Sequence, residues 1–364
     1  MGFVHNPRPV WWRKALFQVH LWTGLILGLI LTVVGLTGSI IVFKPELERM
    51  SIPHLTHVQP QGERVPVQAM LDTMRRERPN YKLSNLYVYQ EPDLAWNFRT
   101  TGPHGHRIQV YLNPYTGKII GEDDFKDHWL DWIYELHEAL LLGKPGLTAN
   151  AIFAWLMVVL SISGLVVWWP GVKHWRFGFR YHRRASWRGQ NYDLHKLGGF
   201  YAALLLIVVS VTGAYYAFPD AYRRAVAWAT AGPATAPTPK SKPREVAAKP
   251  TLDEILARAQ AAMPGARPMI LFLPTNPTAI YSLRMRLPYD WQRTGSNHVY
   301  LDQYTGEVIR ADYFVNRPLG ARIIGVNGPV HFGTFGGDVT RWLWVLLGLM
   351  PGVLFVSGVI MYWN

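Results

Sequence analysis

Histidines open two long apolar stretches of this 364-residue chain. His20 is followed by a glycine four residues later and by a Thr-Gly dipeptide 17 residues later, and His195 is followed by the same residues at the same spacings. These positions are Gly24, Thr37-Gly38, Gly199 and Thr212-Gly213. Neutral imidazole is a common ligand of metal ions and of haem iron. The repeated pattern therefore indicates a ligand site.

Two further histidines also form a matching pair. His137 lies in "LHEALLLG" and His331 in "VHFGTFGG", each with a glycine six residues later and an apolar stretch beyond it. Two imidazoles on one haem iron fill both axial positions, which favours electron transfer over oxygen binding. Zinc or copper between the same histidines is an alternative, and a lone histidine at a helix end is often only an interfacial polar residue.

The elements that must position these histidines are membrane helices. Hydrophobic residues make up 49% of the chain and charged residues 17%, which is typical of a membrane protein with a substantial extramembrane part. A span of about 30 Å of hydrocarbon takes roughly 20 apolar residues. Four segments meet this requirement, near 16–43, 148–169, 197–218 and 342–363.

Charge predicts the orientation of these spans. Basic residues precede the first span and crowd the loop between the second and third, so both flanks are expected in the cytoplasm. The net charge of +13 is then explained mainly by the basic residues that orient the spans in the membrane. These residues can also attract anionic membrane lipid, and a nucleic-acid partner is not expected. The absence of cysteine excludes disulfides, cysteine-ligated iron–sulfur clusters and covalent haem attachment through C-x-x-C-H.

The two segments between spans would then lie outside the cytoplasm. Each contains a stretch in which apolar and polar residues alternate as in a β-strand. Each stretch ends in a Tyr-Thr-Gly turn, "VYLNPYTG" at 110–117 and "VYLDQYTG" at 299–306. "TLDEILARAQAAM" reads as a helix with Thr251 as N-cap and Glu254 completing a capping box. We expect two small α+β domains, one in each segment.

The order of these features repeats, so the chain reads as an internal duplication. Both halves begin on the same side, and such parallel repeats are related by an axis along the membrane normal. His20 should then face His195 at an inner level, and His137 should face His331 at an outer level. The expected segments are 1–43 (amino-terminal residues and first span), 44–147 (first α+β domain), 148–196 (second span and basic loop), 197–218 (third span), 219–341 (second α+β domain with a Pro/Ala-rich linker at 231–250) and 342–364 (fourth span).

Two non-covalent b-type haems are the cofactors that this arrangement favours. His20 and His195 would hold the inner haem iron, and His137 and His331 the outer one. Glycines on the same helix faces would leave room for a flat macrocycle, although small residues also serve plain helix packing. These glycines are Gly24, Gly199, Gly38 and Gly213.

The combination of H-x-x-x-G…TG, the Tyr-Thr-Gly hairpins and the LHEALLLG and VHFGTFGG segments resembles the PepSY-associated transmembrane helix family. The resemblance covers nearly the whole chain and implies a four-helix protein of the bacterial inner membrane with two periplasmic PepSY-like domains. One branch of the family is similar to siderophore-linked ferric reductases, in which two b-type haems serve the reduction of ferric chelates. By that resemblance the family's ligands fall on His20, His137, His195 and His331.

The resemblance implies an oxidoreductase that releases Fe2+ from a ferric siderophore. Some relatives carry a fused flavin module, but no G-x-G-x-x-G follows a strand here, so the electron donor is expected to be separate, either membrane quinol or a cytoplasmic flavoprotein. Two alternatives stay open at this point. One is a haem-free scaffold whose PepSY-like domains bind a partner or inhibit a protease, and the other is a di-haem cytochrome with a different periplasmic acceptor.

Overall fold

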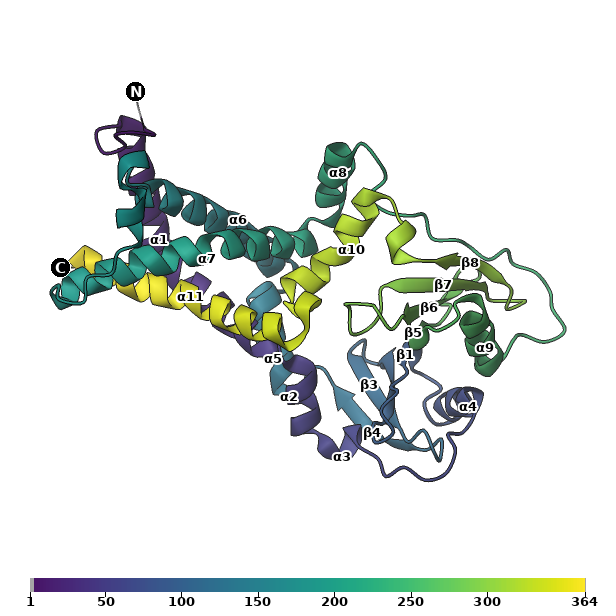
Figure 1. Cartoon of the computed structure of the whole chain (residues 1–364). Coiled ribbons are helices and arrows are strands. Elements are labelled where there is room, and N and C mark those ends of the chain that lie inside the picture. The colour runs from purple at the N-terminus through teal and green to yellow at the C-terminus, as the bar shows by residue number, and fades with distance from the viewer. Residues whose placement is uncertain (1–2, 364) are drawn as a thin grey trace. The chain divides into compact units, whose positions relative to one another are not determined.

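The structure is a computed structural model that describes residues 3–363, and the chain divides into two compact units (Figure 1). The helical unit comprises residues 3–43, 133–222 and 327–363, and the sheet unit comprises 44–132 and 223–326. Of the four boundaries, one lies between α1 and α2, and three fall within helices that contribute residues to both units. These are α5 (Trp129–Ala139), α8 (Pro219–Thr230) and α10 (Leu319–His331).

Four long helices dominate the helical unit. They are α1 (Trp11–Ile41), α6 (Gly143–Trp168), α7 (Trp187–Ala217) and α11 (Gly337–Trp363), with short 3-10 segments at η1 (Val172–Phe179) and η3 (Thr334–Gly336). Within residues 3–363, these four regions are long and apolar enough to cross a membrane. The prediction of four spans is confirmed, although α1 and α7 each begin several residues before the apolar stretch that was predicted to span the membrane.

Each long helix packs against two others. α1 lies against α6 and α11, and α7 lies against the same two helices, so the order around the bundle is α1, α6, α7, α11. Small residues allow the closest approach, since Gly35 of α1 and Gly348 of α11 leave no space for a Cβ at either position. Ser39 closes the same contact by donating to the carbonyl of Val345 at 2.8 Å.

The sheet unit is built around one antiparallel sheet of eight strands in the order β4-β3-β2-β1-β5-β6-β7-β8. The strands are β1 (Lys82–Tyr87), β2 (Trp96–Thr101), β3 (Arg107–Leu112), β4 (Ile119–Asp124), β5 (Arg267–Phe272), β6 (Ile280–Arg286), β7 (Asn297–Asp302) and β8 (Val308–Asp312). The helices of this unit are α2 (Lys44–Ser51), α3 (Pro53–Thr56), α4 (Val67–Glu77), α9 (Leu252–Ala262) and the short η2 (Phe314–Asn316), together with the parts of α5, α8 and α10 noted above.

The two segments that we expected to fold as separate domains therefore share one sheet. Strands β1 and β5 pair through Asn85 with Phe272, Leu86 with Leu271, and Tyr87 with Ile270. Each of these strands would otherwise be an edge with unpaired backbone groups, and their pairing satisfies those groups. Helices α4 and α9 then cover one continuous core instead of two.

Strand alternation separates an apolar face from a polar one. One row of cross-strand partners runs through Val110, Phe98, Leu86, Leu271, Leu283 and Val299, and it forms the core beneath α4 and α9. The next row on the opposite face runs through Gln109, Arg99, Asn85, Phe272, Ser282, Tyr300 and Arg310. The predicted alternation is thus present from β3 to β7, whereas in β4 the partner of Val110 is Glu122.

Two local predictions hold in the sheet unit. Gly117 and Gly306, which close the Tyr-Thr-Gly turns, have φ of 69° and 70°, a conformation that favours glycine. Helix α9 begins with the capping box of Thr251 and Glu254, in which each side chain accepts from the other residue's backbone N–H.

Candidate cofactor sites in the helical unit

The four sequence-predicted histidines come together as two pairs. The ring centroids of His20 and His195 lie 6.4 Å apart, and those of His137 and His331 lie 6.3 Å apart. We call these the first pair and the second pair. His20 and Gly38 both belong to α1, and 18 residues of helix at 1.5 Å each separate them by about 27 Å. Because Gly38 contacts His137, the two pairs lie near opposite ends of the bundle.

Both separations fit two imidazoles that share one metal ion. Two rings bonded to opposite sides of a metal through nitrogen, at about 2.0–2.1 Å, have centroids roughly 6.3 Å apart, since a centroid lies about 1.1 Å beyond its bonded nitrogen. The rings of the first pair are nearly perpendicular, at 89°, and those of the second pair are inclined at 46°.

The tautomer of each ring follows from its hydrogen bonds. Nδ1 of His20 lies 3.0 Å from the carbonyl oxygen of Leu160, and Nδ1 of His137 lies 2.9 Å from that of Val34. Nδ1 of His331 makes the same contact with Val209 at 3.0 Å. A carbonyl can only accept, so each Nδ1 carries the proton and donates it. Nε2 then keeps the lone pair that ligates a metal.

His195 has the same tautomer, but its Nδ1–H donates to a hydroxyl instead of a carbonyl. The Ser357 hydroxyl donates to the carbonyl of Val353 at 2.7 Å, so its oxygen accepts from Nδ1 of His195 at 2.8 Å. Equivalent hydroxyls lie beside the other three rings, at 3.1 to 3.4 Å from Nδ1; they belong to Ser163, Thr37 and Thr212. All four rings thus have Nδ1 held and Nε2 available.

A glycine follows each of these hydroxyl residues and contacts the same ring. A Cβ built at Gly38 would lie 2.9 Å from Cε1 of His137, and one at Gly213 would lie 2.8 Å from Cε1 of His331. At the first pair the corresponding distances are 3.0 Å from Gly164 to His20 and 3.5 Å from Gly358 to His195. We call each Ser-Gly or Thr-Gly dipeptide with the carbonyl three residues before it a histidine cradle.

The cradles change the interpretation of two predicted glycines. Gly38 and Gly213 were expected to leave room for a macrocycle, and the structure places them against the histidine rings themselves. Gly24 and Gly199 differ, because a Cβ at either would make only an ordinary contact of 3.7 Å with a leucine. Both of these glycines line the cavity at the first pair, and their role in haem packing stays a prediction.

Each pair lines a cavity. The cavity at the first pair measures about 500 Å³, within the usual range of about 300–1,000 Å³ for a small-molecule pocket. Apart from the histidines its lining is mainly glycine, aliphatic and aromatic, with Ser161, Tyr192 and Lys196 as polar members. The cavity at the second pair is smaller, about 170 Å³, and includes Asn150 and Tyr216. At the second pair the histidine geometry is therefore the stronger indication of a cofactor.

The second pair is also held through its backbone. The amide of Asn150 in α6 donates to the carbonyl of His137 at 2.6 Å, and the indole of Trp344 in α11 donates to the carbonyl of His331 at 3.0 Å. Sequence reasoning missed these residues and also Ser163 and Ser357. The signal for the serines was present, because a hydroxyl residue precedes glycine in all four cradles.

Comparison with known families identifies the chain. The model of the PepSY-associated TM region matches residues 17–364. The protein belongs to this family. A search of curated proteins gives no match. As a PepSY-associated TM protein with four candidate spans, it is a membrane protein, and both histidine pairs lie within the part matched by the family.

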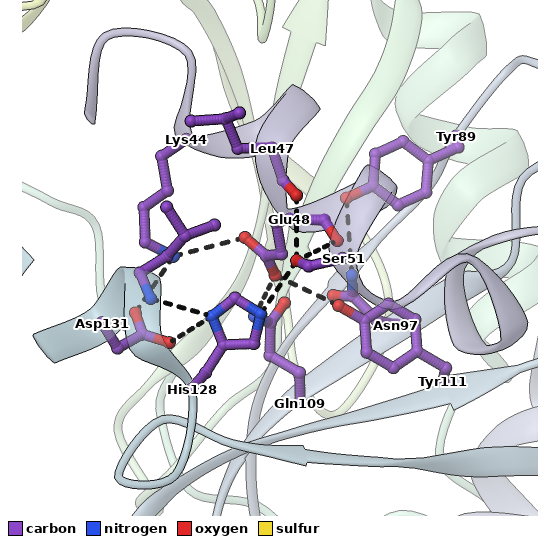
Figure 2. Close-up of polar contacts among 11 residues, drawn as sticks. Lys44, Leu47, Glu48, Ser51, Tyr89, Asn97, Gln109, Tyr111, His128 and Asp131 are labelled. Carbon is purple, nitrogen blue, oxygen red and sulfur yellow. Dashed lines mark hydrogen bonds and ion pairs between the residues drawn. The ribbon is translucent and has the colours of Figure 1, made fainter. Parts of the chain in front are cut away.

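The sheet unit of this PepSY-associated TM protein holds a separate buried polar cluster (Figure 2). Glu48 of α2 accepts from Gln109 at 2.7 Å and from Tyr111 at 3.2 Å. Lys44 lies 3.3 Å from Glu48 and 3.0 Å from Asp131. Sequence reasoning could not place His128, whose Nε2 lies 3.1 Å from the hydroxyl of Ser51 in this cluster.

Burial and charge set the protonation of the cluster. Burial, together with repulsion from Glu48 and Asp131, raises the pKa of Asp123 to about 6. Burial also raises the pKa of Asp131, although Lys44 opposes the change. Burial alone would raise the pKa of Glu48, but Lys44 and three hydrogen bonds together lower it. The cluster therefore holds carboxyls that protonate at different pH values.

Proposed function

We propose that this PepSY-associated TM protein is a di-haem b electron-transfer protein that reduces a ferric chelate, such as a ferric siderophore, and releases Fe2+. The observation that carries the proposal is the separation of 6.4 Å and 6.3 Å between paired imidazoles that both have Nε2 available. Such a protein is an oxidoreductase, and the ferric chelate is its substrate.

The donor set favours haem over a bare metal ion. Each pair supplies two nitrogen ligands, whereas zinc sites in proteins usually use three or four protein ligands. A haem iron, already bonded by its porphyrin, would need from the protein only the two imidazoles that each pair supplies. A b-type haem held at each pair would supply reversible one-electron transfer, and two of them would serve the two ends of the bundle.

The chain's own residues would prepare both sites for this cofactor. A carbonyl in three of the cradles, and the Ser357 hydroxyl in the fourth, accepts from Nδ1–H, which fixes the ring orientation and leaves Nε2 available as a ligand. The glycine of each cradle lets the ring approach its neighbouring helix. Lys196 lines the cavity at the first pair, where it could pair with a haem propionate, and it donates to Asp193 at 2.7 Å.

The membrane arrangement is part of the proposal. The histidine cradles recur at equivalent places in both halves of the chain, which supports an internal duplication with one PepSY-like segment in each half. The basic loop around η1 supports a cytoplasmic amino terminus in the bacterial inner membrane, with the sheet unit in the periplasm. Electrons would come from a separate donor, membrane quinol or a cytoplasmic flavoprotein.

Absorption spectroscopy of the full chain tests the proposal. Protein purified in detergent from haem-replete cells should show a b-type Soret band that shifts on dithionite reduction, with two haems per chain. His137→Ala should remove one haem, and so should His20→Ala. His174→Ala is the matched control, because His174 is exposed in η1 and should leave both haems in place.

The acceptor requires its own assay. Reduced protein should release Fe2+, trapped as a coloured complex, from ferric siderophores. A red protein that reduces none of a chemically varied panel would point to another periplasmic acceptor. A colourless protein would contradict the haem proposal and favour the haem-free scaffold.

A further inference from the structure

The polar face of the sheet carries opposite charge in its two halves. Near β3 and β4, Glu48 and Asp131 contact Lys44 (Figure 2), and Asp123 of β4 interacts electrostatically with all three. In β6, β7 and β8 the same face presents Arg284 beside His298 and Tyr300 beside Arg310, as the cross-strand register requires. Arg317, which follows η2, joins this group.

The contacts of Arg317 leave this group with excess positive charge. Its Nε lies 3.1 Å from Asp312, and its Nη2 donates to Nδ1 of His298 at 2.9 Å. Since His298 accepts this bond, its ring is neutral there. Burial and the three arginines together lower the pKa of His298 to about 3, which agrees with this assignment. We call Arg284, Arg310, Arg317 and His298 the cationic cluster.

In the part of the chain that the structure describes, no carboxylate pairs with Arg310. Its guanidinium carbon lies 4.9 Å from the ring centroid of Tyr300, and its Nε and Nη2 are buried without a hydrogen-bond partner among the described residues. Asp312, the carboxylate that contacts the cluster within residues 3–363, is engaged by Arg317. A half-buried guanidinium with unused donors is costly unless a ligand satisfies it.

Flat side chains lie beside the arginines of the cationic cluster. The rings of His298 and Tyr300 are stacked, with centroids 5.8 Å apart and planes inclined by 7°. Guanidinium groups bind carboxylates through paired, charge-assisted hydrogen bonds. The arginines of the cationic cluster repel one another, so an anion that neutralises them is favoured. A small anion with several carboxylates could bond to the arginines, and a conjugated or metal-chelating part of it could pack against the flat rings.

We propose that the cationic cluster binds the carboxylate groups of an anionic ferric chelate, with Arg310 as the principal contact. The choice of a ferric chelate as ligand rests on the proposed function, whereas the selectivity for carboxylate rests on the cluster itself. A chelate without negative charge would gain nothing from these arginines.

Binding to the detergent-purified full chain tests this proposal. The probes are metal-free citrate, ferric citrate, the cationic ferric complex of desferrioxamine B, and inorganic phosphate. Citrate and ferric citrate should bind in calorimetry, and Arg310→Gln should weaken both by about tenfold or more, the scale of a lost charge-assisted bond. Arg75→Gln is the matched control, since it removes one exposed positive charge from α4, which packs on the opposite face of the sheet.

Thermal unfolding gives a second readout that does not depend on iron reduction. Without ligand, Arg310→Gln should melt at a higher temperature than the wild type, because it removes an unpaired, half-buried charge. With citrate the wild type should gain stability and the variant should not. A lower melting temperature of the variant without ligand, or equal stabilisation of both proteins by citrate, overturns the proposal.

The remaining outcomes separate this proposal from the proposed function. If ferric chelates are reduced but Arg310→Gln binds ferric citrate as well as the wild type does, the cationic cluster is not the site and the reductase proposal stands. If citrate binding depends on Arg310 but no ferric chelate is reduced, the anion site stands and the reductase proposal fails. Tighter binding of phosphate than of citrate overturns the assignment to carboxylate.

Discussion

Gly213 and the imidazole of His331 are in contact so close that a Cβ on residue 213 would lie 2.8 Å from Cε1 of the ring. Real Cβ atoms essentially never approach this closely, so an alanine at this position must displace the ring or the helix that carries it. The equivalent contact at the first pair, between Gly358 and His195, is looser, at 3.5 Å. This difference between equivalent positions allows a controlled test.

Gly213→Ala should therefore impair the second pair, while Gly358→Ala should be tolerated. We expect the first variant to bind about one haem per chain and the second to keep two, as measured by the pyridine haemochrome method. Retention of two haems with unchanged spectra in Gly213→Ala would contradict the role of the cradle glycine.

The Ser357 hydroxyl is expected to orient His195 for ligation. Removing such an outer hydrogen bond typically weakens metal affinity by about 10–100-fold. Ser357→Ala should lower haem retention at the first pair during competition with apomyoglobin and alter the low-spin spectrum of that haem. Ser161→Ala removes a hydroxyl that lines the same cavity, so it should behave as the wild type. Equal haem loss from both variants would indicate a general packing defect.

Asp123 should make the sheet unit less stable as the pH rises. Its pKa is raised to about 6 in the folded state from an ordinary value of 3.8. The folded state therefore holds the proton more tightly, and the stabilisation is present below pH 4 and is lost as the pH rises through 6. The charged and titratable groups around it are Lys44, Glu48, His128 and Asp131.

Asp123→Asn should remove this dependence. At pH 8 the variant should be more stable than the wild type by about 3 kcal/mol, since one pKa unit corresponds to about 1.4 kcal/mol, and near pH 4 the advantage should vanish. Thermal melting of the sheet unit at several pH values measures the effect, with the exposed Glu91→Gln as control. An advantage of the same size at both pH values would show that another cause is responsible.

The eight-stranded sheet should unfold as one cooperative unit. Leu86 and Leu283 are fully buried in strands that arise from the two different segments, and both belong to one core. Truncating either to alanine should cost about 2–5 kcal/mol. Hydrogen exchange in the full chain should then rise in both hairpins, β3–β4 and β7–β8, whichever leucine is changed. Exchange confined to the mutated half would indicate two independent domains.

Local patterns were the part of the fold that the sequence could predict. Apolar length determined the four spans, and the turns at Gly117 and Gly306 followed from the conformation that glycine alone adopts easily. The repeated spacing around His20 and His195 was enough to anticipate that these side chains would lie close together.

Long-range pairing was beyond reach of the same reasoning. The sequences of β1 and β5 do not show whether each strand lies at the edge of a sheet or pairs with a strand of the other segment, as Tyr87 of β1 pairs with Ile270 of β5. The polar cluster around His128 was missed for a similar reason, because Lys44 and Ser51 come from α2, which is distant in sequence from His128 and Asp131. The cradle serines were visible as Ser-Gly dipeptides, but their role needed the packing of α6 against α1 and of α11 against α7.

The distribution of ligands and cradles has a consequence for how the protein is made. Helix α1 carries a ligand of the first pair and the cradle of the second, and α7 does the same. The ribosome must translate the chain as far as His331 before both histidines of the second pair exist. It must translate as far as Gly358 before the histidines of the first pair have all of their contacts. The nascent chain therefore has neither site complete while its earlier helices enter the bilayer. Cofactor loading would then be a late step in biogenesis, after the last helix has been inserted.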